Sequence, residues 1–357
     1  MKVIIALILI VFAATSYAQS DKEKARDLAM EAIQKMEAGN TKEAEQLLEK
    51  SKKLDPDNID YPYEIAYCHY LDKNYSGAIK ILEKLVKHED VNDRIYQMIG
   101  NCHDLNKNPD EAIKSYEAGL KLFPNSGILY LERGNMELIK EDYGKALMYY
   151  ESGIAVRPSF PSNYYWAAKI YLSSTEEVWG LIYGEMFMNL ERNSRRTQEI
   201  SKIIFDTYKS QITLQSDSTM SVSFCKQMTM TVDDLEKGED IKLPFCMVYE
   251  PTLLMSIISV KEINLASLDA VRTRFINSYY DSENDKTYPN VLFDFHKELI
   301  EKGHFEAYNH WVLMMGAEDE FTEWNKANAN KWDRFVAWFT ENPMTIDEAH
   351  KFHSGQY

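Results

Sequence analysis

Residues 130–158 of the chain read YLERGNMELIKEDYGKALMYYESGIAVRP. The stretch has the spacing of two helices joined by a short turn. Gly134 lies within the first predicted helix, and Asp142 immediately precedes the second. A carboxylate at that position can accept hydrogen bonds from the free N–H groups at a helix start. Pro158 ends the second helix, because the residue before a proline is pushed out of the α region.

The same pattern recurs upstream with a period of 34 residues. The alanines mark places where two helices approach too closely for a larger side chain, and the leucines and tyrosines bury against the partner helix. The repeated positions are Asn40, Asn74, Asn108 and Asp142; Ala44, Ala78, Ala112 and Ala146; Leu48, Leu82, Tyr116 and Tyr150; and Ala32, Ala66, Gly100 and Gly134. Three units close with Pro56, Pro124 and Pro158, and Asp90 occupies the remaining place.

Four units in one register resemble the tetratricopeptide-repeat (TPR) superfamily. The units run 25–58, 59–92, 93–126 and 127–160, followed by a partial fifth unit at 161–193 and a capping helix at 194–211. An unrelated helical bundle is the alternative. The resemblance implies an all-α protein with a right-handed TPR helix-pair solenoid over residues 19–211, whose first helices line a concave, protein-binding groove.

The first 18 residues have the layout of a secretory signal peptide. Lys2 supplies a positive start, Val3 to Ala14 are apolar, and Ser16-Tyr17-Ala18 is a small-residue cleavage site. An uncleaved N-terminal anchor is the alternative. No later run reaches the 18 apolar residues of a spanning helix. We therefore expect a mature chain without a membrane span that is periplasmic or secreted.

The second half is expected to hold a linker with short strands at 212–251 and a mostly helical domain at 252–357. Residues 220–224 and 227–232 alternate apolar and polar side chains, which predicts a short β-hairpin followed by a charged turn at 233–240. The predicted helices are 252–260, 265–280, 290–302, 304–315, 317–327 and 329–341. Trp311, Trp324, Trp332 and Trp338 are expected to form the domain core, with a docking surface as the alternative. We assign this half to no family.

The cysteines and the charge balance restrict the function. Four cysteines permit three disulfide pairings, and Cys225 with Cys246 is favoured because both lie in the segment with strand character. The alternative is that they are unpaired and buried. With 56 acidic against 40 basic residues, the surface should repel nucleic acid and anionic membranes. A basic or neutral protein partner or peptide fits the charge.

The family resemblance implies which residues contact a partner. These are the groove-facing residues of the first helices: Tyr63, Tyr67, Tyr70, Arg94, Gln97, Asn101, Asp104, Leu131, Asn135, Leu138, Tyr165 and Lys169. Asn101 and Asn135 occupy a place where many family members hold a peptide backbone. The alternative is that the tyrosines only cover the inner wall. A carboxylate clamp of the chaperone-tail type is not expected, because its places hold Ala29, Ile33, Glu64, Gln97 and Asn101.

We expect no cofactor and no metal. The dipeptides Cys68-His69 and Cys102-His103 suggest zinc by composition, but equivalent positions in stacked helices lie too far apart for bonds of about 2 Å. The segment Asp281–Asp285 has Lys286 where a calcium loop needs glycine. No catalytic motif is present, so the expected function is a non-catalytic interaction scaffold. The alternatives are a hydrolase using His296, His304, Glu306 and His310, or a permanent structural subunit of an envelope complex.

Overall fold

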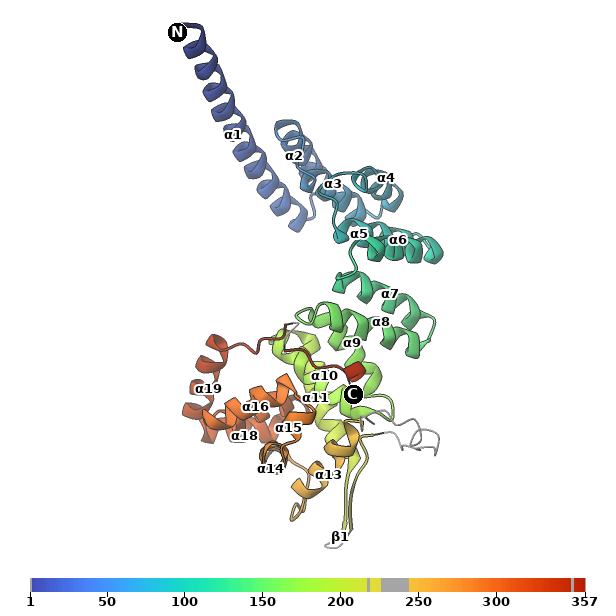
Figure 1. Cartoon of the computed structure of the whole chain (residues 1–357), viewed down its shortest axis with the longest axis vertical. Helices are drawn as coiled ribbons and strands as arrows, with labels where there is room; N and C mark the ends of the chain where they lie inside the picture. The colour runs from blue at the N-terminus through green and yellow to red at the C-terminus, as the bar shows by residue number, and fades with distance from the viewer. Residues whose placement is uncertain (1, 217–218, 226–243, 348–349, 357) are drawn as a thin grey trace. The chain divides into compact units, whose positions relative to one another are not determined.

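The computed structural model describes residues 2–216, 219–225, 244–347 and 350–356. In these ranges the chain is mainly helical, with one two-stranded antiparallel sheet. It divides into two compact units, residues 1–136 and 137–357 (Figure 1). The predicted fold of stacked helix pairs with a short β-hairpin is confirmed. The division falls inside the fourth repeat, while the predicted domain boundaries stay a prediction.

The first unit is a succession of helix pairs in which each helix, from α1 to α6, contacts the next. The short turns between consecutive helices follow from the 34-residue period. The helices are α1 (Lys2–Glu37), α2 (Thr41–Leu54), α3 (Asp60–Leu71), α4 (Tyr75–Leu85), α5 (Asp93–Leu105), α6 (Pro109–Leu122) and α7 (Gly127–Ile139), which crosses into the second unit.

The expected signal peptide falls within α1, which is one helix from Lys2 to Glu37. Among the helices that the structure describes, none combines the length and the apolar character needed to cross a membrane.

The predicted capping residues precede the second helices as expected, but only two of the four use their side chains. Asn74 accepts from the Gly77 N–H at 3.1 Å, and Asp142 accepts from the Lys145 N–H at 3.1 Å. Asn40 and Asn108 form no side-chain cap. At Asn108 the next residue is Pro109, whose missing N–H already removes one unpaired donor from the helix start.

A left-handed residue recurs in the turn before each second helix. Gly39 has φ of 80°, Lys73 of 60°, Lys107 of 63° and Glu141 of 60°. These positions again repeat every 34 residues, directly before the capping column. The turn therefore needs a backbone conformation that favours glycine, yet only the first repeat places glycine there.

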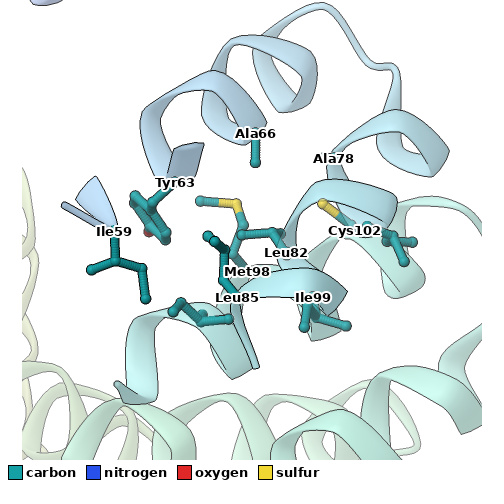
Figure 2. Packing of buried hydrophobic residues seen from close by; sticks show 11 residues of the cluster. Ile59, Tyr63, Ala66, Ala78, Leu82, Leu85, Met98, Ile99 and Cys102 are labelled. Atoms are coloured by element: carbon teal, nitrogen blue, oxygen red, sulfur yellow. The ribbon is translucent and has the colours of Figure 1, made fainter. Parts of the chain in front are cut away.

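Among the described residues of the first unit, three clusters of buried side chains form the core. In the cluster between α3, α4 and α5, Ala66 and Ala78 make room for Leu82, Met98 and Cys102 (Figure 2). The pairing of a small with a large residue continues in the next repeat. A Cβ atom at Gly100 would lie 2.1 Å from the Tyr116 ring, so the tyrosine requires glycine opposite it.

The second unit is built around α10 (Glu177–Leu190), in which every residue from Glu177 to Asn189 is buried. A helix that is buried on all sides belongs in a core, and α10 contacts α9, α11 and α16. The helices preceding the sheet are α8 (Tyr143–Val156), α9 (Pro161–Tyr171) and α11 (Arg195–Gln211). Those following it are α13 (Cys246–Ser256), α14 (Leu265–Asp281), α15 (Asn284–Thr287), α16 (Val291–Glu301), α17 (Phe305–Leu313), α18 (Glu318–Ala327) and α19 (Ala329–Glu341), with 3-10 turns η1 (Met314–Gly316) and η2 (Ser354–Gln356).

The β-hairpin differs from the predicted one. β1 (Ile212–Ser216) pairs antiparallel with β2 (Thr219–Val222), with Ile212 opposite Val222. Residues 220–222 are thus a strand as expected, but their partner precedes them in the chain. The predicted strand at 227–232 and the turn at 233–240 lie outside the described residues. The predicted Cys225–Cys246 disulfide is present.

The helices after the sheet follow the prediction closely, apart from the first. α13 begins at Cys246, whereas the predicted helix begins at 252; Pro251 lies inside α13. A proline at this place predicts a break, but the helix continues through it at the expense of one hydrogen bond. Trp311 is buried and Trp324, Trp332 and Trp338 are half-buried. Their rings pack into one aromatic network with Phe335 and Phe339.

Candidate functional site

Three candidate tyrosines lie along one side of α3. Tyr63, Tyr67 and Tyr70 are spaced by four and three residues, which places them on the same helix face. Tyr63 is only 8% exposed and belongs to the core cluster, so it supports the face from beneath. Tyr67 and Tyr70 are half-buried, and their rings stack with centroids 5.9 Å apart. These two rings offer rigid contact area at little entropic cost.

Arg94 links α5 to α3. Its guanidinium lies over the Tyr63 ring, 4.6 Å from the ring centre, and its Nη2 is 4.0 Å from Oε1 of Glu64. Burial raises the pKa of Glu64, although Arg94 opposes the shift. The arginine is exposed, so the pair with Glu64 contributes less than about 1 kcal/mol to stability. Its main effect is to cover the Tyr63 ring at one end of the α3 face that carries the three tyrosines.

Glu132 links α5 to α7 in the same way. Its carboxylate accepts from Nε2 of Gln97 at 2.9 Å and from Nδ2 of Asn135 at 3.1 Å. Two predicted contact residues are therefore held by an acid that was not predicted. The Asn135 amide group is already engaged, so a bound peptide would have to compete with Glu132 for it.

Asn101 is the candidate best prepared to bind a peptide. The Tyr116 hydroxyl donates to its Oδ1 at 2.6 Å and so fixes the orientation of the amide. Its amide N–H groups have no acceptor among the residues that the structure describes. The side chain is half-buried, as are Asp104 and Leu131. An oriented amide donor beside acidic side chains suits the carbonyl groups of an extended peptide.

The remaining candidates, Leu138, Tyr165 and Lys169, lie in the second unit. Tyr165 is 6% exposed, and its hydroxyl donates to Glu199 at 2.6 Å. Lys169 donates to the same carboxylate at 2.7 Å. Burial raises the pKa of Tyr165, and the bond to Glu199 adds to the shift. Lys169 and Glu199 thus neutralise each other above a tyrosine that is not itself open to a partner.

A hollow of about 480 Å³ lies beside Lys169. Sequence reasoning missed its aromatic lining, which Trp166 and the exposed Tyr143 provide. Leu138 also lines it. Trp166 directly follows a predicted contact residue, so its position was a usable signal. Glu199 lies on α11, and nothing in the repeat pattern pointed to it.

The three histidines and the glutamate of the alternative catalytic site each contact a neighbouring side chain. His296 is 3% exposed and its Nε2 lies 2.6 Å from Oε1 of Glu185. His304 stacks on Trp338 at 5.2 Å, and His310 on Trp324 at 4.0 Å. Glu306 accepts from the Trp324 indole at 2.8 Å and pairs with Lys331. Each of these side chains is thus occupied by a structural neighbour.

Cys68 and Cys102 lie in two different core clusters. Burial raises the pKa of both thiols to about 12, so neither is a thiolate at neutral pH. No group of three potential metal ligands occurs among the described residues.

Helix pairs of fixed length, with polar and aromatic side chains along the first helix of each pair, define a helical-repeat protein. The family comparison identifies the repeat. Tetratricopeptide-repeat models match residues 35–102 and 93–126. Residues 35–126 therefore consist of tetratricopeptide repeats. No curated protein matches it.

Several solved structures are similar to parts of the chain. PilF of Pseudomonas aeruginosa is 20% identical, with a TM-score of 0.43, and the match covers 54% of this chain and 90% of that one. A thermophilic TPR protein of Thermus thermophilus is 14% identical, with a TM-score of 0.42, covering 50% and 98%. YrrB, a TPR protein described as having an unusual peptide-binding site, is 16% identical, with a TM-score of 0.33, covering 51% and 94%.

Proposed function

We propose that the protein is an exported, non-catalytic interaction module that binds an extended segment of a partner protein. The binding face in the first unit consists of Tyr67, Tyr70, Gln97, Asn101 and Asp104 on α3 and α5. The observation that carries this proposal is the Asn101 amide, which Tyr116 orients while its N–H donors are left without an acceptor in the described chain. Tetratricopeptide repeats commonly use their first helices for such contacts.

The charges of this face favour a basic or neutral segment. Glu64, Asp104 and Glu132 are partly exposed there, and Arg94 is the cation that lies among them. A carboxylate-rich ligand would meet uncompensated negative charge, whereas lysine or arginine side chains would find partners. The tyrosine pair would then pack against an apolar side chain of the same segment.

In-cell crosslinking of the mature protein, followed by identification of captured proteins, tests the proposal. The test variant combines Tyr67→Ala, Asn101→Ala and Asp104→Ala. The matched control combines Leu122→Ala and Met148→Ala, which are exposed side chains on second helices. We expect the test variant to lose at least one partner that the wild type and the control retain. If every partner is retained by the test variant, the proposed face is wrong.

Location and permanence of binding are checked separately. Fractionation should place the mature protein outside the cytoplasm, beginning after Ala18. Gel filtration of a native extract should show the partner exchanging with free protein. A single stable large complex would instead identify a permanent structural subunit.

A further inference from the structure

The described residues after α19 pack against earlier elements of the second unit. Met344 and Ile346 are buried, while Thr345 and Asp347 between and after them are exposed. Such alternation is typical of an extended segment lying on a surface. Farther along, Lys351, Phe352 and Ser354 contact α8, α10 and Phe245, as the following distances show.

Phe352 fills an aromatic slot and is fully buried. Its ring centre is 5.5 Å from that of Trp179 on α10 and 5.3 Å from that of Phe245, which directly precedes α13. Trp179 and Phe245 also contact each other at 5.6 Å. The two rings thus form two walls of a site for one phenyl group.

Polar contacts flank the phenyl group on both sides. Lys351 Nζ donates to the Ala155 carbonyl at 3.1 Å, in the last turn of α8 where carbonyls lack helical partners. The Ser354 backbone N–H donates to the Tyr183 hydroxyl at 2.8 Å, and the Ser354 hydroxyl donates to Glu151. Glu151 also accepts from Tyr183 at 2.9 Å. The cation, the phenyl ring and the hydroxyl of this segment therefore each contact a different partner: the Ala155 carbonyl, the two aromatic rings and Glu151.

We propose that this surface of α8, α10 and Phe245 is a second peptide-binding site, whose ligand class is a segment with the pattern Lys-Phe-x-Ser. The chain's own residues 351–354 are its resident ligand. The combination of side-chain pockets with a backbone hydrogen bond is the one that peptide-recognition surfaces use. This site is independent of the face on α3 and α5.

Because residues 351–354 are covalently linked to the rest of the chain, they occupy the site more readily than a free peptide would. A short linker holds a terminal segment near its site at an effective concentration of about a millimolar. A free peptide of the same sequence, added at micromolar concentration, should therefore fail to displace the resident segment. Weakening the resident segment should open the site to the added peptide.

The experiment measures fluorescence anisotropy of a labelled peptide, HKFHSGQY, which has the sequence of residues 350–357. The full-length Phe352→Ala chain should bind it roughly tenfold or more tightly than the wild-type chain does, since about a millimolar of tethered ligand has been removed. A peptide with alanine in place of phenylalanine should bind neither chain. Adding Glu151→Gln to the Phe352→Ala chain should weaken binding severalfold, whereas adding Met148→Ala, an exposed change on α8, should not.

Circular dichroism confirms that each variant is folded. If Phe352→Ala fails to fold, the double variant Lys351→Ala with Ser354→Ala replaces it, because this variant removes only polar contacts and keeps the buried ring. It too should bind the peptide more tightly than the wild type. Equal binding by opened and wild-type chains, or equal binding of both peptides, would show that the segment is only part of the core.

Discussion

At the scale of single residues, the turns inside the repeats hold removable strain. Lys107 adopts φ of 63°, a conformation that costs a non-glycine residue about 1–2 kcal/mol. Lys107→Gly should remove that strain, offset by the greater freedom of glycine in the unfolded chain. We expect a net gain in the free energy of unfolding of up to about 1 kcal/mol.

The matched change is Gly39→Ala, at the equivalent position with φ of 80°. It should lose about 1 kcal/mol, because alanine takes on the strain that Lys107 already carries. Urea unfolding of both variants measures the two effects. A loss of stability on Lys107→Gly would mean that the lysine side chain makes a contribution that the turn geometry does not reveal.

Another residue-scale prediction concerns the pairing of glycine with tyrosine in the third repeat. Gly100→Ala would place a Cβ atom 2.1 Å from the Tyr116 ring, and overpacking of this kind costs about 1–3 kcal/mol. In the second repeat the two equivalent positions hold a larger and a smaller residue, Ala66 and Leu82, which pack in the same cluster. Gly100→Ala should therefore be tolerated when Tyr116→Leu is also present.

A double-mutant cycle measured by denaturant unfolding tests this coupling. The alanine should cost less in the Tyr116→Leu background than in the wild type, because the clash is absent there and alanine favours helix by up to about 1 kcal/mol over glycine. Additive losses would contradict a direct clash between the two positions.

At the scale of elements, α10 is held by a buried ion cluster. Arg272 on α14 pairs with Glu185, and His296 on α16 lies 2.6 Å from the same carboxylate oxygen. All three side chains are at most 5% exposed. Glu185→Gln would leave the Arg272 charge uncompensated in the interior. We expect a loss of about 3–5 kcal/mol in the free energy of unfolding, against a small effect for Glu323→Gln, whose side chain is 75% exposed.

The same cluster makes the second unit sensitive to acid. Burial lowers the pKa of His296 below 6.5, so the unfolded chain binds a proton first and stability falls as pH drops below 6.5. Burial alone would raise the pKa of Glu185, but Arg272 and His296 outweigh it and lower it to about 2. Its contribution is present above pH 4.5 and is lost as pH falls from there toward 2.

His296→Gln should reduce the loss of stability as pH falls below 6.5, because glutamine can still donate to Glu185 but does not titrate. His350→Gln is the control, since that side chain is exposed. Melting temperature recorded as a function of pH measures the effect. Burial also lowers the pKa of His304, His310 and His353, so some acid sensitivity should persist. An unchanged pH profile in His296→Gln would show that His296 does not titrate with unfolding.

The repeat pattern predicted elements whose stabilising contacts lie within one or two repeats. Alanine, capping and aromatic columns therefore located the helices of the first unit. Contacts between segments far apart in the chain were harder to predict from the sequence. The partner of residues 220–222 in the hairpin and the return of Phe352 to α10 depend on tertiary geometry. Glu185 could have been used as a signal for the buried ion cluster, because a single acid within the apolar run 178–188 must find a buried partner.

The candidate face was predicted only in part, for a related reason. Position within the repeat named Asn101 and Asn135 equally, but their neighbours differ. Tyr116 orients Asn101, whereas Glu132 already occupies Asn135. Periodicity shows which side of a helix a residue occupies; it does not show which long side chain from the next helix reaches it first.

At the scale of the whole molecule, we expect the negative charge around the proposed face to guide the approach of a partner. The chain carries a formal charge of −16, and Glu64 on α3, Asp104 on α5 and Glu132 on α7 contribute to it at the proposed face. A basic segment should be attracted over distances comparable with the Debye length, about 8 Å at physiological salt and about 3 Å at 1 M. Raising salt should therefore slow association more than it speeds dissociation.

Stopped-flow association with a partner captured in the crosslinking experiment tests this expectation. The association rate should fall by about tenfold or more between low and high salt, because steering of this kind raises rates by roughly 10–10³. Asp104→Asn should flatten the dependence, whereas Asp57→Asn, on the loop before α3, changes net charge equally and should affect the rate less. Equal effects of the two variants would mean that total charge, and not the charge of the proposed face, guides the partner.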